Sequence, residues 1–219
     1  GVSYTSVEEN RSVRNLYICN LDGSENQLIT QSGKSISNAR WSADGKQIVF
    51  LKGGQIRTAE ICHKNGKWTL SGERQVSNVP AGVGEFKLSP DQKKVMYISY
   101  VKSSVKSPSD CYSDLDKATA YTTDDLMYRH WDHTVMEIPH TFVSGFSFNG
   151  SVTAASSKDI LEGEKELYEL PTEPFSGIEQ LDWSPDGKFI AYSCRKVTGK
   201  RYAFSTDTEI YIYNVQSGE

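Results

Sequence analysis

The chain alternates short apolar runs with short polar turns, and one ten-residue stretch illustrates the pattern. "WSPDGKFIAY" (183–192) joins a tryptophan, a tight turn and an apolar run. In the turn, proline presets φ for the first corner, aspartate suits the second, and glycine takes the positive φ that follows. The run after it is apolar on both faces, which predicts a strand covered on both sides. Trp183 is large and apolar, so we expect it to be buried.

The same unit recurs along the chain. It begins at Trp41, Leu88 and Trp183, and its turns occupy residues 42–45, 89–92 and 184–187. The first interval is 47 residues and the second is 95, about twice as long. We therefore expect either a degenerate copy or a copy with an insertion near residues 130–155. Gln92 replaces the turn glycine in the second copy, so that turn should be strained or of another type.

Most of the remaining sequence also predicts strands and turns. Residues 15–29 and 209–215 have strand patterns, and Asn65-Gly66 and Asn149-Gly150 are hairpin signals. Only the polar segment 108–131 tolerates a turn or two of helix. An all-β chain with a period in the forties is typical of a β-propeller. Its 219 residues predict a partial propeller of about four to five blades, spanning 1–219 as one domain.

The composition of the chain argues against nucleic-acid binding and membrane insertion. The net charge is −4, which argues against a nucleic-acid surface or a polybasic membrane anchor. No apolar stretch reaches 18 residues, so no membrane span is expected, and residues 1–25 contain no signal peptide pattern. The four cysteines form no CxxC pair and are expected to be small buried apolar residues, although their even number leaves a disulfide open.

The chain contains no complete catalytic motif. Serine hydrolysis on an α/β-hydrolase needs a Gly-x-Ser-x-Gly elbow followed by aspartate and histidine. The nearest match, residues 145–149, lacks the final glycine, and no histidine follows Ser147. We therefore predict no catalytic residue and no cofactor, since a glycine-rich phosphate loop is also absent.

His130, Asp132 and His133 form the densest group of metal-ligand types. On extended chain the two histidines would point in different directions, so we predict no metal site. The favoured interpretation is structural, with Trp131 buried and its polar neighbours bonded to a long loop. The alternative is a substrate-facing role for Arg129, His130 and Asp132. The acidic groups at 124–125 and 162–166 are expected to be solvated loops.

Several segments resemble a known family. The Ser-Pro-Asp-Gly-Lys turn followed by a strand resembles the TolB-like, WD40-like propeller repeat. "YRHWDHTVMEIPHTFV" (128–143) resembles the propeller of prolyl-oligopeptidase-family serine peptidases. "DILEGE" (159–164) and residues 177–214 resemble the bacterial dipeptidyl peptidase V and acylaminoacyl-peptidase branch. The resemblance covers roughly residues 10–217.

The resemblance implies a serine exopeptidase in which a propeller of seven or eight blades gates an α/β-hydrolase domain. That hydrolase domain is absent from the 219 residues, so the chain alone is expected to be inactive. The implied partners are peptide substrates, and the implied location of the parent protein is the periplasm or outside the cell. The alternative is a standalone TolB-like periplasmic protein-binding propeller. In either case, uncovered apolar sheet faces would favour self-association.

Overall fold

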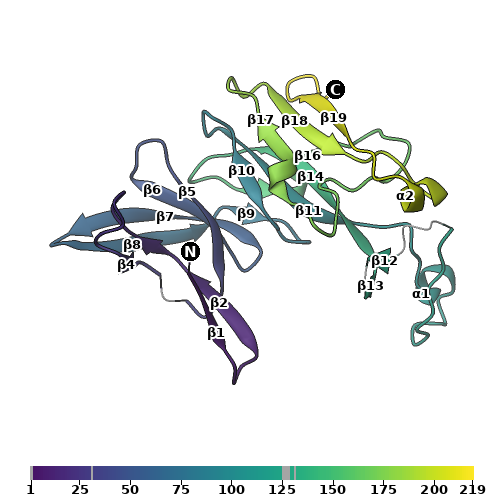
Figure 1. Cartoon of the computed structure of the whole chain (residues 1–219), viewed down its shortest axis with the longest axis horizontal. Coiled ribbons are helices and arrows are strands. Elements are labelled where there is room, and N and C mark those ends of the chain that lie inside the picture. The colour runs from purple at the N-terminus through teal and green to yellow at the C-terminus, as the bar shows by residue number, and fades with distance from the viewer. Residues whose placement is uncertain (1, 31, 125–128, 131) are drawn as a thin grey trace. The chain divides into compact units, whose positions relative to one another are not determined.

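The computed structural model describes residues 2–30, 32–124, 129–130 and 132–219 (Figure 1). The chain divides into two compact units. The first comprises Gly1–Leu88, Gln92–Val95 and Ser144–Ser157, and the second comprises Ser89–Asp91, Met96–Val143 and Lys158–Glu219. Strands dominate both units, which confirms the all-β class.

The first unit begins with four short strands that form two separate two-stranded sheets. β1 (Val2–Ser6) pairs with β2 (Arg11–Asn15), and β3 (Tyr17–Ile18) pairs with β4 (Gln27–Leu28), both antiparallel. Only Leu16, which is buried, separates β2 from β3. The turn between β3 and β4 places Gly23 at φ 82°, as the Asp-Gly signal in this stretch predicts.

The next sheet is an uninterrupted antiparallel meander. Its strands are β5 (Ile36–Trp41), β6 (Gln47–Lys52), β7 (Gln55–Lys64) and β8 (Lys67–Gln75), in that order. Asn65 and Gly66 both have positive φ in the β7–β8 turn, as expected for a two-residue hairpin loop. Residues 48–51 of β6 are all buried, so this strand is covered on both faces. β9 (Ser77–Asn78) then pairs in parallel with β15 (Val152–Thr153), so the Asn149-Gly150 turn before β15 makes no hairpin.

The following sheet explains the 95-residue interval. Its order is β10 (Phe86–Leu88), β11 (Lys94–Lys102), β14 (Glu137–Gly145) and β16 (Ser157–Asp159). Residues 103–136 are inserted between β11 and β14 and contain α1 (Pro108–Cys111), β12 (Arg129–His130) and β13 (His133–Thr134). Of the two predicted alternatives, the insertion is therefore correct, although it occupies residues 103–136 and so begins before the expected region 130–155. The helical stretch of this segment is a single turn.

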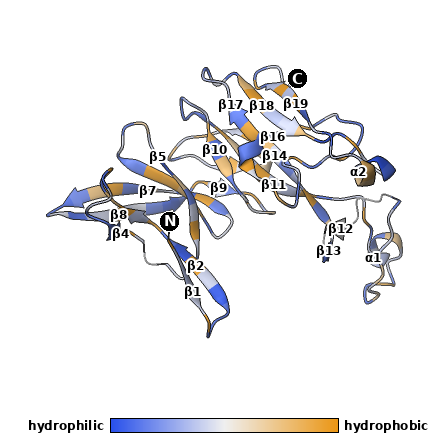
Figure 2. Cartoon of the chain, in the orientation of Figure 1, coloured by the Kyte–Doolittle hydropathy of each residue, from blue (hydrophilic) through white to orange (hydrophobic). Residues whose placement is uncertain are grey.

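The last sheet has three strands, β17 (Leu181–Trp183), β18 (Phe189–Cys194) and β19 (Glu209–Asn214). The short helices in this part of the chain are η1 (Ala154–Ser156), η2 (Ile178–Gln180) and α2 (Lys200–Phe204). Within the second unit, one face of this sheet packs on β11 and β14 in a core that includes Met96, Val143, Leu181, Ile190 and Tyr192. Hydrophobic residues lie mainly on such strands, as along β11 (Figure 2).

Besides the two-stranded pairs, the described part of the chain thus forms three successive sheets of propeller type, the first two with four strands and the last with three. Trp183 is 9% exposed, as expected, whereas its counterpart Trp41 is 47% exposed and lines an apolar hollow of the first unit. Identical positions in the repeat therefore differ in burial. A tryptophan is buried only where a neighbouring sheet covers it.

The repeated turn has one hydrogen-bond pattern in all three copies. The hydroxyl of Ser42 donates to Asp44 over 2.6 Å, and Ser89 and Ser184 do the same with Asp91 and Asp186. In the first and third copies the serine oxygen also accepts a hydrogen bond from a backbone N–H of the following strand: Ser42 from Gln47, and Ser184 from Phe189. The serine hydroxyls, together with the backbone N–H groups of Lys46 and Lys188, donate to the carboxylates and lower the pKa of Asp44 and Asp186.

Gln92 occupies the glycine position of the turn with φ 55°, so the second copy keeps the same turn despite the substitution. The Gln92 amide accepts a hydrogen bond from the Ala43 N–H (2.7 Å) and donates one to the Trp41 carbonyl (2.9 Å). The side chain that glycine lacks therefore connects two neighbouring copies of the turn. These bonds offset the strain of a non-glycine residue at positive φ.

Candidate functional site

The insertion between β11 and β14 leaves and returns at one point. The Ser103 N–H donates to the Met136 carbonyl over 2.9 Å, and the Ser103 hydroxyl donates to the Val135 carbonyl over 2.5 Å. We call this closure, formed by Ser103 with Val135 and Met136, the neck of the insertion; Val105 and Val135 are buried beside it. The insertion is therefore fastened at its base and makes its own local structure beyond it.

The first half of the insertion is organised around a single carboxylate. Asp110 accepts hydrogen bonds from the N–H and the hydroxyl of Ser107, and it pairs with the Lys102 ammonium at 2.6 Å. The Lys102 and Ser107 hydrogen bonds lower the pKa of Asp110. Reciprocal backbone bonds between Lys106 and Thr122 join the two sides of the loop. These contacts give a polar segment a defined conformation without a large core.

The second half carries the sequence-predicted substrate-facing residues. β12 pairs with β13, with Arg129 opposite Thr134 and His130 opposite His133. The carboxylate of Asp132 is 95% exposed in the connection, and its Oδ1 lies 3.5 Å from His133 Nδ1. The structure thus brings Arg129, His130 and Asp132 to one hairpin. The side chains of Arg129 and His130, and all of Trp131, lie outside the described residues, so the role of these residues remains a prediction.

A hollow of about 670 Å³ lies beside this hairpin, within the second unit. It is lined by Tyr100 and Lys102 at the end of β11, by His133, Thr134, Met136 and Glu137, and by Glu173 and Pro174. The lining combines two carboxylates with a cation and an aromatic ring. Such a surface suits a ligand that carries both polar and apolar groups.

Tyr100 and Glu173 form the main polar contact in the hollow. The Tyr100 hydroxyl donates to Glu173 Oε1 over 2.7 Å. Burial raises the pKa of Tyr100, and the hydrogen bond to Glu173 and the charges of Glu173, Glu137 and Glu169 raise it further. Tyr100 therefore remains a hydroxyl donor at neutral pH and is not an activated nucleophile.

Glu169 is a buried carboxylate in the second unit and is 3% exposed. Its Oε2 accepts a hydrogen bond from the Tyr202 hydroxyl over 2.7 Å, and the Arg195 guanidinium carbon lies 3.7 Å from the centroid of the Tyr202 ring. A buried carboxylate is costly unless it is bonded and compensated. The Glu169–Tyr202–Arg195 cluster therefore has a structural role in holding α2. Burial and the charge of Glu169 raise the pKa of Tyr202.

Sequence reasoning missed Glu169 and Glu173. The available signal was the stretch "LYELPTEP" (167–174), where two glutamates lie among tyrosine, leucine and proline instead of among other charges. In the acidic segment 162–166, which was predicted to be a solvated loop, Glu164 forms an ion pair with Lys196. The Lys196 ammonium lies 4.1 Å from the Tyr211 ring centroid. Glu162 and Glu166 are exposed, as expected for a solvated loop.

Other candidate chemistry stays dispersed. Ser147 follows β14 in a turn that leads to the strand β15, whereas a nucleophile elbow would lead directly into an α-helix. Within the described residues, no three histidine, cysteine or acidic side chains are arranged to hold a metal.

The four cysteines are free thiols that form no disulfide in the described structure, and only Cys194 is buried. The expectation of four buried cysteines was therefore wrong: Cys19, just after β3, and Cys111, at the end of α1, are exposed, and Cys62 is half-buried. No helix in the described part of the chain has the length and apolarity to cross a bilayer.

Comparison with known proteins identifies dipeptidyl-peptidase relatives, although no family model matches the chain. Dipeptidyl-peptidase 5 of Porphyromonas gingivalis is 42% identical over 219 residues, covering 99% of this chain and 30% of the relative. Dipeptidyl-peptidase 5 of Porphyromonas endodontalis is 35% identical with the same coverage. The chain is a homologue of part of these dipeptidyl-peptidases. It spans about 30% of their length.

The solved structures agree in fold. Acylaminoacyl peptidase of Pyrococcus horikoshii covers 99% of this chain with a TM-score of 0.54 at 17% identity, and the chain covers 28% of that protein. At this identity the likeness concerns the fold alone. Together with the dipeptidyl-peptidase relatives, it confirms the predicted resemblance to the propeller portion of prolyl-oligopeptidase-family peptidases.

Proposed function

We propose that this chain is the non-catalytic propeller portion of a serine exopeptidase, which gates and positions peptide substrates for hydrolysis elsewhere in the parent protein. The observation that carries the proposal is the 42% identity to a dipeptidyl-peptidase 5 over nearly the whole chain. The dispersed candidate chemistry supports a role in substrate access. Function in the periplasm or outside the cell is part of the proposal, and fractionation of the native host would test it.

The hollow beside the insertion is the proposed substrate-facing surface. A peptide with a free amino terminus carries an ammonium group, and Glu137 and Glu173 offer carboxylates in that hollow. Glu173 already accepts the Tyr100 hydroxyl, whereas Glu137 is exposed at the start of β14. Arg129, His130 and Asp132 on the adjoining hairpin would meet the same substrate.

A chimera tests the proposal. The matched region of the Porphyromonas gingivalis dipeptidyl-peptidase 5 is replaced by this chain, and release of dipeptides from chromogenic substrates is measured. We expect activity from the chimera and only background hydrolysis from the chain alone. A folded but inactive chimera, or turnover by the isolated chain, would contradict the proposal.

The same chimera tests the site. Glu137→Gln and Asp132→Asn should raise KM severalfold and leave kcat nearly unchanged, because loss of ground-state binding acts on KM. Asp116→Asn, in the first half of the insertion, is the matched control. Equal KM values for all three variants would remove the hollow and hairpin from the proposed site.

A further inference from the structure

A second polar hollow lies in the first unit, on residues that the proposed function does not use. It has a volume of about 320 Å³ and is lined by Ser3 of β1, by Arg14 and Leu16, and by residues 36–40 of β5. The lining contains two guanidinium groups, two hydroxyls and one carboxamide, and it contains no carboxylate. Leu16, Ile36 and Ala39 supply apolar surface beside these donors.

A bulge in β5 builds one wall of the hollow. The register between β5 and β6 shifts between Ser37 and Arg40, so the two intervening residues have no regular ladder partner. One of them, Asn38, has φ 52°, and its side-chain amide donates to the Phe86 carbonyl over 2.9 Å. Bulges and left-handed non-glycine residues re-aim side chains and are frequent at functional sites. The backbone here is held by a specific contact in a conformation that it would not adopt by default.

Within the described residues, the two arginines of the hollow form no hydrogen bond or ion pair with a carboxylate. Arg14 Nε reaches the Ser3 hydroxyl only at 3.4 Å, and Arg40 Nη1 donates to the carbonyl of Ala39, its chain neighbour. Among the ion pairs of the described residues, none includes Arg14 or Arg40.

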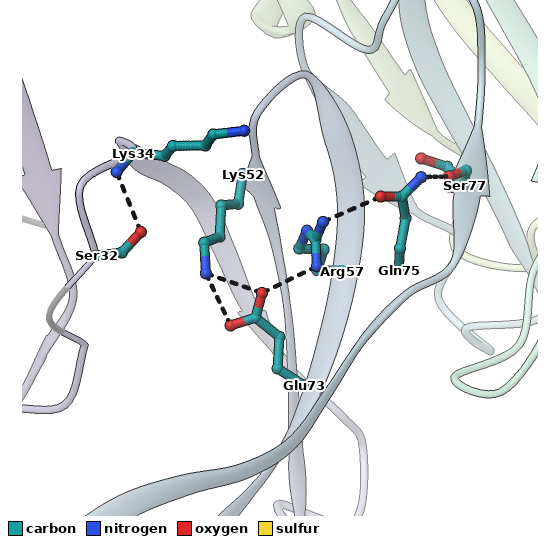
Figure 3. Close-up of polar contacts among 7 residues, drawn as sticks. All are labelled: Ser32, Lys34, Lys52, Arg57, Glu73, Gln75 and Ser77. Atoms are coloured by element: carbon teal, nitrogen blue, oxygen red, sulfur yellow. Dashed lines mark hydrogen bonds and ion pairs between the residues drawn. The ribbon is translucent and has the colours of Figure 1, made fainter.

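Lys52 of β6 and Arg57 of β7 differ in this respect. Figure 3 shows Glu73 between them, with the Lys52 ammonium at 2.9 Å and Arg57 Nη1 at 3.1 Å. Arg57 also donates to Gln75, which donates in turn to the Ser77 carbonyl (Figure 3). Glu73 therefore compensates these two cations, whereas no ion pair of the described residues occupies the two guanidinium forks of the hollow.

The charge of the unit favours an anionic ligand. The first unit has 13 Lys and Arg against 8 Asp and Glu, a formal charge of +5. The second has 11 against 20, a formal charge of −9, and together they give the net −4 of the chain. An excess of one sign around a hollow raises the local concentration of ligands of the opposite sign.

We propose that this hollow binds the carboxylates of an acidic peptide. Arginine forks match carboxylate geometry with two parallel hydrogen bonds, and the hydroxyls of Ser3 and Ser37 can add further donors. The apolar lining fits the methylene stem of a glutamate side chain in a way that a free inorganic anion would not use. This proposal rests only on contacts within the first unit and does not depend on the peptidase assignment.

Isothermal titration of the full chain with an N-acetylated, C-amidated tetraglutamate peptide tests the proposal, with the tetraglutamine peptide as the neutral probe. The double variant R14Q/R40Q should weaken tetraglutamate binding about tenfold or more, as expected for loss of charge-assisted hydrogen bonds. R14K/R40K keeps the charge without the fork and should weaken binding severalfold. The matched control K67Q/R74Q removes two cations from β8 in the same unit and should change the affinity less than about twofold.

Each other outcome contradicts a stated part of the proposal. Equal losses in R14Q/R40Q and K67Q/R74Q would show diffuse attraction to the unit in place of a site. Inorganic phosphate that binds as tightly as tetraglutamate would show a general oxyanion site and overturn the peptide assignment. Equal binding of tetraglutamine would contradict the proposal that the hollow recognises carboxylates. If R14Q/R40Q fails to fold by circular dichroism, the R14K/R40K comparison decides in its place.

Discussion

β11 and β18 follow the same repeated turn and carry similar apolar runs, but their surroundings differ. In β11, residues 95–99 are all buried, so both faces of the strand are covered. In β18, Ile190, Tyr192 and Cys194 are buried, whereas Phe189 is 38% exposed. The paired strand β19 exposes more apolar surface on that second face, with Ile210 at 80% and Ile212 at 61%.

The comparison shows what a local apolar run can and cannot specify. The run in β18 predicts coverage on both faces, and this prediction was wrong for the last sheet. Its alternate residues meet the core that includes Met96 and Val143, while the opposite face meets no sheet in the described structure. Strand formation depends on the local sequence, but two-sided burial depends on a second packing partner.

The largest expected effect separates the two faces of the last sheet. Ile190→Ala should destabilise the protein by about 2–5 kcal/mol, because it leaves a cavity in a closed core. Ile212→Ala removes the same atoms from the exposed face and should change the free energy of unfolding by less than about 0.5 kcal/mol. Urea denaturation measures both. Equal losses would mean that the second face is also buried in solution.

Thiol chemistry provides a second comparison of buried and exposed positions. Burial raises the pKa of Cys194 to about 11, from an ordinary value near 9. At pH 8 this lowers the reactive thiolate fraction about a hundredfold, and the closed core slows labelling further. We expect a disulfide reagent, followed by peptide mapping, to label the exposed Cys19 and Cys111 first. Labelling of Cys194 at the same rate as Cys111 would contradict the packing of this face.

The exposed face of the last sheet should promote self-association, since uncovered apolar patches drive contact. Ile210→Ser with Ile212→Ser should weaken association about tenfold, because two large apolar side chains leave the surface. Light scattering over a concentration series measures this effect. Val7→Ser, which changes an isolated residue that is 89% exposed, serves as the control. A wild-type chain that stays monodisperse at high concentration would contradict the prediction.

The smallest expected effect concerns the turn at residues 89–92, which precedes β11. Gln92→Ala keeps the positive φ and loses the two bonds to residues 41 and 43, whereas Gln92→Gly loses the bonds and relieves the strain. The alanine variant should therefore be less stable than the glycine variant by about 1 kcal/mol. Thermal unfolding compares them. Two variants of equal stability would mean that the left-handed backbone at Gln92 carries no strain.

Much of the fold could be predicted because turn chemistry is local. The serine and aspartate of each turn determine its hydrogen bonds within a few residues, and the spacing of the copies predicts a repeated sheet. The position of the insertion could not be read in the same way. The interval between Leu88 and Trp183 has the same length for an insertion as for a degenerate blade, and only the pairing of β11 with β14 distinguishes them.

The candidate sites were less predictable because distant segments build them. The hairpin of His130 and Asp132 was found from its unusual composition. The hollow beside it depends on Tyr100 and Glu173, which are 73 residues apart and meet through one hydrogen bond. Arg14 and Arg40 gave no sequence signal, since single arginines are common on surfaces. Their proposed function depends on the bulge at Asn38 and on the lack of an acidic partner among the described residues.

The neck of the insertion has a consequence for how such a protein could change over generations. Ser103 and Met136 close the segment with a backbone bond at the edge of two strands, so the sheet requires only that the ends of the segment meet. The 34 residues 103–136 can therefore lengthen, shorten or be exchanged at little cost to the strands that carry them. Exchange of this segment could therefore change substrate specificity while the sheet that carries it stays unchanged.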